Sequence, residues 1–363
     1  MSLACPQLSD RRPPVPGAGD PTRFLSTGWR VRFRIACRVA TVVSLAPLVP
    51  AGASPQEPVW PPPPAAPCVV YVGSIARPAD IGAKPSALGW LANQITGATD
   101  GNRELVKPFG LSLDDASNLL VTDTGANAVC YLDRARKKWL RWEKVGKVRF
   151  ESPVAIARHG QTFFVADSSL GKVSAFDEKG KVQFEITRDL ERPSGLAILQ
   201  DKLFIADSQR HAVLIFSVRG DLLSKFGRRG AGPGEFNYPT HVTVDAVGRV
   251  YVTDSLNFRI QVFDASGQFQ RAIGSAGDGP GHFSRPKGVA VNRSGHVYVV
   301  DALFDNVQIF DAEGRLLLNW GESGAGPGQF WLPNAIAISR DNLIYVADSY
   351  NRRIQVFKYT GHP

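Results

Sequence analysis

The sequence predicts an all-β fold: a six-bladed β-propeller of repeated four-stranded units, whose ring is closed by an N-terminal strand. Two observations carry this prediction. One short pattern recurs six times at a nearly constant spacing, and each copy divides into four strand-like segments. The composition agrees, since 35 glycines and 26 prolines among 363 residues are typical of a chain with many turns.

Each repeat is marked by an aspartate that ends an apolar, β-branched segment, and by a proline 14 or 15 residues before it. The six aspartates are Asp123, Asp167, Asp207, Asp254, Asp301 and Asp348, which lie 44, 40, 47, 47 and 47 residues apart. The matching prolines are Pro108, Pro153, Pro193, Pro239, Pro286 and Pro333. Six copies of one pattern at this period indicate a repeat architecture with one blade per copy.

The fourth repeat shows its strands most clearly, at 240–245, 249–254, 259–264 and 269–274. Short segments joined by turns that contain glycine and aspartate predict an antiparallel meander. Inner strands that are apolar on both faces fit blades that pack against each other in a ring. We call the edge with the inter-blade connections and the loops between second and third strands the top rim, and the opposite edge the bottom rim.

The last repeat ends after its third strand, so one outer strand is missing from the C-terminal blade. The segment 68–75 resembles the fourth-strand pattern of 269–276. We expect 69–74 to pair antiparallel with 354–357, because an unpaired apolar edge would invite aggregation. The propeller then spans 68–363, with a Pro-rich linker at 54–67 and a top-rim insert at 76–107. Within the insert, Ser86 is predicted to begin a short helix that ends at Gly97.

Residues 1–53 are predicted to be a leader and signal peptide. A basic stretch precedes an apolar run at 39–53, which ends in a small-x-small cleavage motif. The arginines of that stretch are Arg30, Arg32, Arg34 and Arg38. We expect the mature chain to begin near Ser54, with translation starting at Val31, and to be periplasmic or extracellular without a transmembrane segment. The alternative is a leader that stays in the cytosol.

The charge balance bears on the class of partner, and the cysteine content bears on a possible disulfide. Residues 1–53 hold seven of the 42 Lys and Arg and two of the 33 Asp and Glu, which leaves 35 basic against 31 acidic side chains. That balance gives no case for a nucleic-acid partner. The remaining cysteines, Cys68 and Cys130, either form a disulfide, as an oxidising compartment would allow, or stay as two buried thiols.

The repeats carry a glycine-rich loop, a proline, a V-A-V-D-type strand and an R-I-Q-V-F-type strand, and in this they resemble the NHL repeat family. The resemblance covers about 110–358 and is sharpest at 226–264 and 320–357. In the peptide-amidating lyase branch of these propellers, three blades place a zinc-binding histidine just after the inner-strand proline. No histidine occupies those positions here, so the resemblance implies no zinc set. The metal set of gluconolactonase-like propellers has no matching positions either.

The residues after the six inner-strand prolines should encircle the top mouth of the pore. They are Phe109, Val154, Ser194, Thr240, Lys287 and Asn334. Their chemistry differs between blades, and variation on a rigid scaffold often carries specificity, so we predict that this ring binds the ligand. Drift at unimportant positions would look the same. The six aspartates repeat once per blade and are predicted to be structural, as acceptors for loop amides. We predict no catalytic residue, metal or cofactor.

Two function classes remain. The first is an exported, non-catalytic propeller that binds a protein or an envelope ligand as a monomer. The second is a metal-dependent propeller enzyme of lyase or lactonase type. RNA binding, known among cytosolic NHL propellers, is a weaker alternative, because the export signal and the small net charge argue against it.

Overall fold

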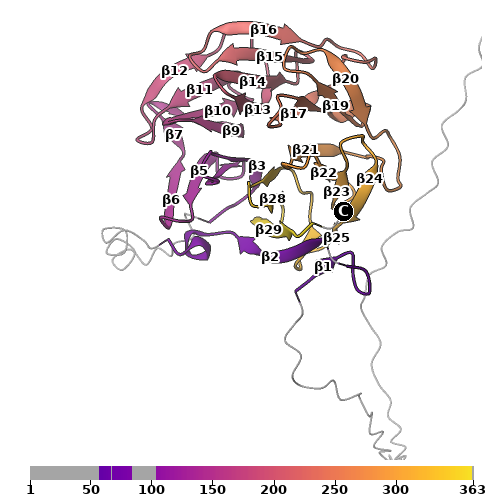
Figure 1. Ribbon diagram of the computed structural model, residues 1–363. Coiled ribbons are helices and arrows are strands. Elements are labelled where there is room, and N and C mark those ends of the chain that lie inside the picture. Colours follow the sequence, from indigo (N-terminus) through magenta and orange to yellow (C-terminus); the bar gives the residue numbers. More distant parts are fainter. Residues whose placement is uncertain (1–56, 67, 84–103, 362–363) are drawn as a thin grey trace, which may run out of the picture. The chain divides into compact units, whose positions relative to one another are not determined.

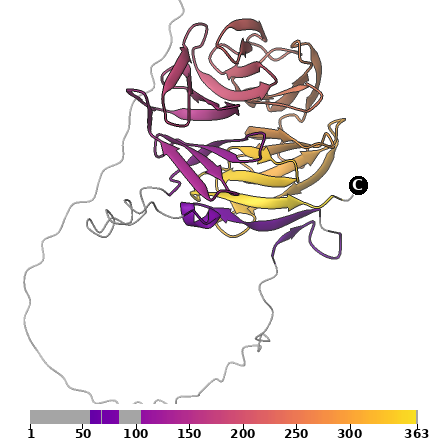
Figure 2. The same ribbon diagram turned by 60° about the vertical axis from the view of Figure 1, so that its left-hand side comes forward.

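The computed structural model describes residues 57–66, 68–83 and 104–361, and these form a six-bladed β-propeller (Figure 1). Each blade is an antiparallel sheet, and Figure 2 shows the same ring turned by 60°. The innermost strands are β3 (Pro108–Leu113), β9 (Pro153–His159), β13 (Pro193–Leu199), β17 (Pro239–Val244), β21 (Pro286–Val291) and β27 (Ile336–Ile338). The second strands are β4 (Leu119–Asp123), β10 (Thr162–Asp167), β14 (Lys202–Asp207), β18 (Val250–Asp254), β22 (Val297–Asp301) and β28 (Leu343–Asp348).

The third and fourth strands complete the blades. The third strands are β5 (Ala128–Asp133), β11 (Lys172–Phe176), β15 (Ala212–Ser217), β19 (Arg259–Phe263), β23 (Asn306–Phe310) and β29 (Arg353–Tyr359). The outermost strands are β6 (Lys138–Trp142), β12 (Val182–Ile186), β16 (Leu222–Phe226), β20 (Phe269–Ile273), β24 (Leu316–Trp320) and β2 (Val69–Ile75). The short pieces are β1 (Val59–Trp60), β7 (Lys144–Val145), β8 (Val148–Arg149), β25 (Glu322–Ser323), β26 (Gln329–Phe330), and the 3-10 turns η1 (Pro78–Ile81) and η3 (Ser255–Asn257).

The core lies between the blades. Each pair of neighbouring blades encloses one cluster of buried apolar side chains, so six such layers run around the described ring. Strands β4 and β5 are buried at every position, whereas β20 and β24 alternate between partly buried and exposed residues before a buried end. This pattern follows from the packing, because an inner strand has a neighbouring blade on both faces. The predicted fold class is therefore confirmed.

The ring closes through the predicted N-terminal strand. β2 pairs antiparallel with β29, from Val69 opposite Tyr359 to Ile75 opposite Ile354. Figures 1 and 2 both show these segments side by side, although they come from opposite ends of the chain. Ile75 packs in one cluster with Leu119 of the first blade, so closure joins the last blade to the first.

The Pro-rich linker contains a strand that the sequence did not suggest. β1 pairs with β2 and adds a fifth strand to the last blade. The Trp60 ring lies 5.8 Å from the Phe357 ring, and a Cβ on Gly328 would stand 2.2 Å from the Trp60 indole. The Trp60 ring can therefore pack here only because residue 328 is a glycine. Gly328 has a φ of +76°, and the equivalent Gly234 has a φ of +75°, a backbone conformation that favours glycine.

The insert begins with η1, whose Ile81 is buried against the first blade, and the Leu105 amide donates to the Ala76 carbonyl at 2.8 Å. The helix expected from Ser86 to Gly97 lies outside the described residues, as do the leader and the signal peptide. No helix in the described part of the chain is long and apolar enough to cross a membrane. Cys68 is a half-buried free thiol and Cys130 a buried one.

Candidate ligand site at the top of the central channel

A central channel runs between the innermost strands. Its lower part is a cavity of about 420 Å³ lined by all six of these strands. The strands approach closely where glycine occurs: a Cβ on Gly195 would lie 2.9 Å from the Cα of His241. Glycine at this position lets β13 contact β17 directly and holds His241 at the channel wall.

A second cavity, of about 310 Å³, lies at the top rim, and we call it the top-mouth cavity. Val154 and His241 line both cavities, so the two hollows adjoin at these residues. Five of the six predicted ring residues line the top-mouth cavity, namely Phe109, Val154, Ser194, Thr240 and Lys287. The remaining lining residues are Ser168, Arg192, Ser208, Tyr238, His241, Ser255, Leu256 and Arg285. Repeat register thus brings the predicted positions together around one hollow.

Asn334, the sixth predicted residue, is placed differently. It is 5% exposed, and its Nδ2 donates to the Phe109 carbonyl at 3.0 Å. Its own carbonyl accepts from the Gly288 amide at 2.8 Å. The Asn334 side chain therefore links the last blade to the first and is occupied by that bond.

The top-mouth cavity is cationic. Arg192, Arg285 and Lys287 line it, and no aspartate or glutamate does. Among the ion pairs of the described residues, none involves these three side chains. Burial, and then the neighbouring Arg285, lower the pKa of Lys287 to about 8, while Asp301 acts in the opposite direction. The cavity thus gathers positive charge that the described protein leaves without a partner.

His241 forms part of the same wall. Its Nδ1 lies 3.2 Å from the Thr240 hydroxyl, and its Nε2 is buried without a hydrogen-bond partner. Burial, and then the charge of Lys287, lower the pKa of His241 to about 3. The imidazole is therefore neutral at physiological pH, and its Nε2 is a buried polar atom without a partner.

The strand-end aspartates fix the loops that carry two of the cations. Asp207 accepts the Arg192 backbone amide at 3.0 Å, and Asp301 accepts the Arg285 amide at 3.0 Å. Each also accepts amides of its own loop, such as that of Gln209 for Asp207 at 3.1 Å. These are the contacts expected of structural Asx-type acceptors, and their effect is to hold the two arginines at the mouth.

Asp254 and Asp348 accept hydrogen bonds from side chains of their own third strand in addition to loop amides. Asp254 accepts from the Arg259 side chain at 2.9 Å and from Gln261 at 3.0 Å, and Asp348 pairs in the same way with Arg353 at 2.8 Å. The R-I-Q-V-F motif therefore supplies a buried partner for the aspartate of its own blade.

The top face around the mouth also exposes apolar side chains. Leu256, Leu303 and Tyr350 occupy the same position, two residues after the strand-end aspartate, in the last three blades. They are 51%, 54% and 45% exposed. Trp331 is 54% exposed, and its ring lies 5.5 Å from that of Tyr350. Exposed side chains of this kind gathered on one face are typical of an interaction surface.

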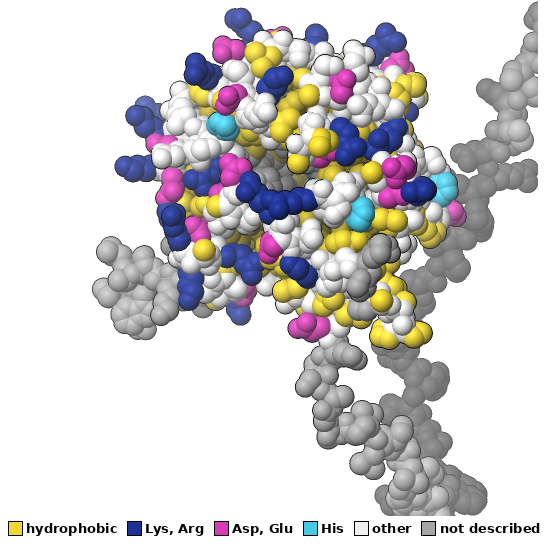
Figure 3. All heavy atoms as spheres, viewed as in Figure 1, with side chains coloured by type: hydrophobic (Ala, Val, Ile, Leu, Met, Phe, Trp, Pro, Cys, Tyr) yellow, Lys and Arg dark blue, Asp and Glu magenta, His cyan; other side chains and the backbone are white. Residues whose placement is uncertain are grey.

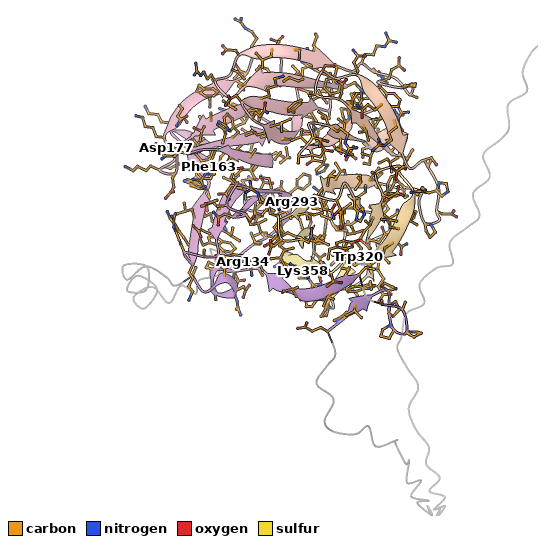
Figure 4. The ribbon with its side chains drawn as sticks, viewed as in Figure 1. Arg134, Phe163, Asp177, Arg293, Trp320 and Lys358 are labelled. Carbon is orange, nitrogen blue, oxygen red and sulfur yellow. The ribbon has the colours of Figure 1, made fainter. Side chains whose placement is uncertain are left out.

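The opposite face differs in its charges. Figure 3 shows this face, with a hollow at its centre, and Arg293 lies near that centre in Figure 4. Several charged groups beside the hollow are paired. Arg158 contacts Asp114 at 2.9 Å, and Arg340 contacts Asp115 at 3.7 Å. Part of the charge at the bottom mouth is therefore neutralised by ion pairs, whereas none of the three cations that line the top-mouth cavity has one among the described residues.

Sequence reasoning missed Arg192, Arg285 and His241. The signal for the two arginines was present, because both stand immediately before an inner-strand proline and so occupy equivalent positions in the third and fifth repeats. In the described residues no group of three or more His, Cys, Asp or Glu side chains is placed to hold a metal ion.

Comparisons with known proteins agree with the fold. Residues 187–248 and 245–303 match the family described as 6-bladed beta-propeller, and residues 330–357 match the NHL repeat. No curated protein matches the chain. Hydrazine synthase of Kuenenia stuttgartiensis is 15% identical, with a TM-score of 0.52 over 70% of this chain and 96% of that one. Virginiamycin B lyase of Staphylococcus aureus is 13% identical, with a TM-score of 0.51 over 70% and 95%. A Bacteroides thetaiotaomicron protein of unknown function is 15% identical, with a TM-score of 0.55 over 70% of each chain. At these identities the likeness shows the fold alone.

Proposed function

Taking the chain as a six-bladed propeller of NHL-type repeats, we propose that it is an exported, non-catalytic binding module of the cell envelope. It holds a protein or another envelope ligand against its top face. The observation that carries this proposal is the difference between the two faces. The top combines unpaired cations around a cavity with a row of exposed apolar side chains, and neither feature serves the fold.

A matched pair of variants tests the proposal. Leu303 on the top face and Val247 on the bottom rim are both exposed turn residues, at 54% and 77%. Full-length protein carrying Leu303→Asp should lose a partner that the wild type captures from envelope extract, because a carboxylate cannot be accommodated in an apolar contact. Val247→Asp should retain it. If only Val247→Asp lost the partner, the binding surface would lie on the bottom face and the proposal would be contradicted.

Export and catalysis have separate readouts. Cell fractionation and N-terminal sequencing should find a mature chain that begins near Ser54 outside the cytoplasm. An intact N-terminus in the cytosol would contradict export.

Virginiamycin B lyase is an enzyme by its name, so the enzyme alternative is tested directly by metal analysis. One equivalent of zinc or calcium that survives dialysis of the purified protein would favour a metal-dependent propeller enzyme instead.

A further inference from the structure

We infer that the top-mouth cavity binds a small organic acid, whose carboxylate or phosphate group is held by Arg192, Arg285 and Lys287. Its apolar part lies against Phe109 and Val154. The inference rests on the proposed function, since it names the ligand chemistry of the same surface. It adds that the recognised group is anionic and that it enters the cavity itself.

The positive charges that line the top-mouth cavity indicate an anionic ligand. Three cationic side chains from the third and fifth blades line one cavity, without an ion pair among the described residues and without an acidic residue in the wall. Cations gathered in this way repel each other, and partial burial of Lys287 adds to the cost. An anion in the cavity would remove both penalties, and arginine and lysine are the side chains that bind carboxylates and phosphates most strongly.

The positions of two cations are built into the backbone. The carboxylates of Asp207 and Asp301, both completely buried, hold the amides of Arg192 and Arg285. Each arginine is then followed by the proline that begins an innermost strand, which restricts the chain on its other side. The backbone that carries both arginines is therefore fixed before a ligand arrives, so ordering of these loops adds no entropy cost on binding.

The remaining walls indicate what is attached to the anion. Phe109 and Val154, from the first two blades, give the cavity an apolar side. His241 also lines the cavity, and its buried imidazole, neutral at physiological pH, adds no further charge to the wall. A volume of about 310 Å³ is at the lower end of the range for small-molecule sites. An inorganic anion would leave the apolar wall uncovered, which favours a compact acid with a hydrocarbon part.

The test is calorimetry on the full-length protein with three probes: benzoate, phenyl phosphate and the neutral benzamide. We expect at least one of the two acids to bind, and benzamide not to bind. The benzoate and phenyl phosphate arms distinguish a carboxylate from a phosphate ligand. Lys287→Gln and Arg285→Gln should each raise the Kd of the bound acid about tenfold or more. Arg285 is exposed, so its substitution tests the site even if the Lys287 variant does not fold.

Two matched controls remove the same charge elsewhere. Lys107 lies on the top face, but its ammonium is 4.6 Å above the Tyr350 ring, and Arg293 is exposed on the bottom rim. Lys107→Gln and Arg293→Gln should change the Kd by less than about threefold. The inference is overturned if neither acid binds at about 10 mM, if benzamide binds as tightly as the acids, or if the cavity variants behave like the controls. Capture of a partner that is lost with Leu303→Asp would still support the proposed function in each of these cases.

Discussion

Replacing Ile75 by alanine should destabilise the whole propeller, because this side chain lies where the last blade meets the first. Ile75 is 4% exposed and stands opposite Ile354 in the ladder that closes the ring. It shares a buried cluster with Tyr345 of β28 and Leu119 of β4. Truncating a buried isoleucine to alanine costs about 2–5 kcal/mol, and here the lost contacts involve side chains of two neighbouring blades. We therefore expect a loss of about 3–4 kcal/mol in the free energy of unfolding.

Val72 provides the control on the same strand, since it is 46% exposed. Val72→Ala should change the free energy of unfolding by less than about 0.5 kcal/mol. Urea unfolding followed by tryptophan fluorescence gives the free energy of unfolding of both variants. The urea midpoints are compared with the m-value, the slope of free energy against urea concentration, held equal. If Ile75→Ala is as silent as Val72→Ala, then β2 does not close the ring in solution and the packing argument fails.

Three further predictions follow from individual side chains. Asp254→Ala should lower the free energy of unfolding by about 3–5 kcal/mol, because it leaves the Arg259 guanidinium, the Asn237 backbone amide and the Gln261 side-chain amide without this acceptor. The exposed Asp278→Ala, measured by the same urea titration, should have little effect. Binding of benzoate should be strongest below the pKa of Lys287, about 8, and weaken as the pH rises through it, because the ammonium loses its charge; calorimetry showing no change across that pH would contradict the assigned contact. Ellman's reagent should modify Cys68 in the folded protein but not Cys130, whose pKa burial raises to about 12, and equal rates would count against this packing.

The sequence predicted the ring well because every blade solves the same packing problem with the same residues. The recurring proline and aspartate set the period, and the missing outer strand of the last blade pointed to 68–75, of which β2 covers Val69–Ile75. β1 was not predicted, since two residues between prolines show no periodicity. Its position depends on the open space above Gly328, which is a property of the folded blade and not of the local sequence.

The candidate site was predicted in part, for a related reason. Repeat register assigns a residue to a height and a blade, and this placed Phe109, Thr240 and Lys287 correctly around one cavity. Register does not give the direction of a side chain. Asn334 occupies an equivalent position, yet its amide is turned to the Phe109 carbonyl of the neighbouring blade. His241 follows the predicted ring by one residue, and only the contact of β13 with β17 shows that it lines the channel.

The residues before the prolines share one backbone hydrogen bond, but their side chains have different roles. Asp123 holds the amide of Lys107 at 2.9 Å, as Asp207 holds that of Arg192. The backbone arrangement is therefore shared, but the Lys107 ammonium is taken up by the Tyr350 ring and hydroxyl, whereas Arg192 has no ion-pair partner among the described residues. Packing of the repeat requires only the aspartate and the proline. It leaves the side chains on either side of the proline free to vary. The residues before the prolines supply Arg192 and Arg285 to the top mouth, and the residues after them supply the apolar Phe109 and Val154, so this variation makes the mouth cationic on one side and apolar on the other.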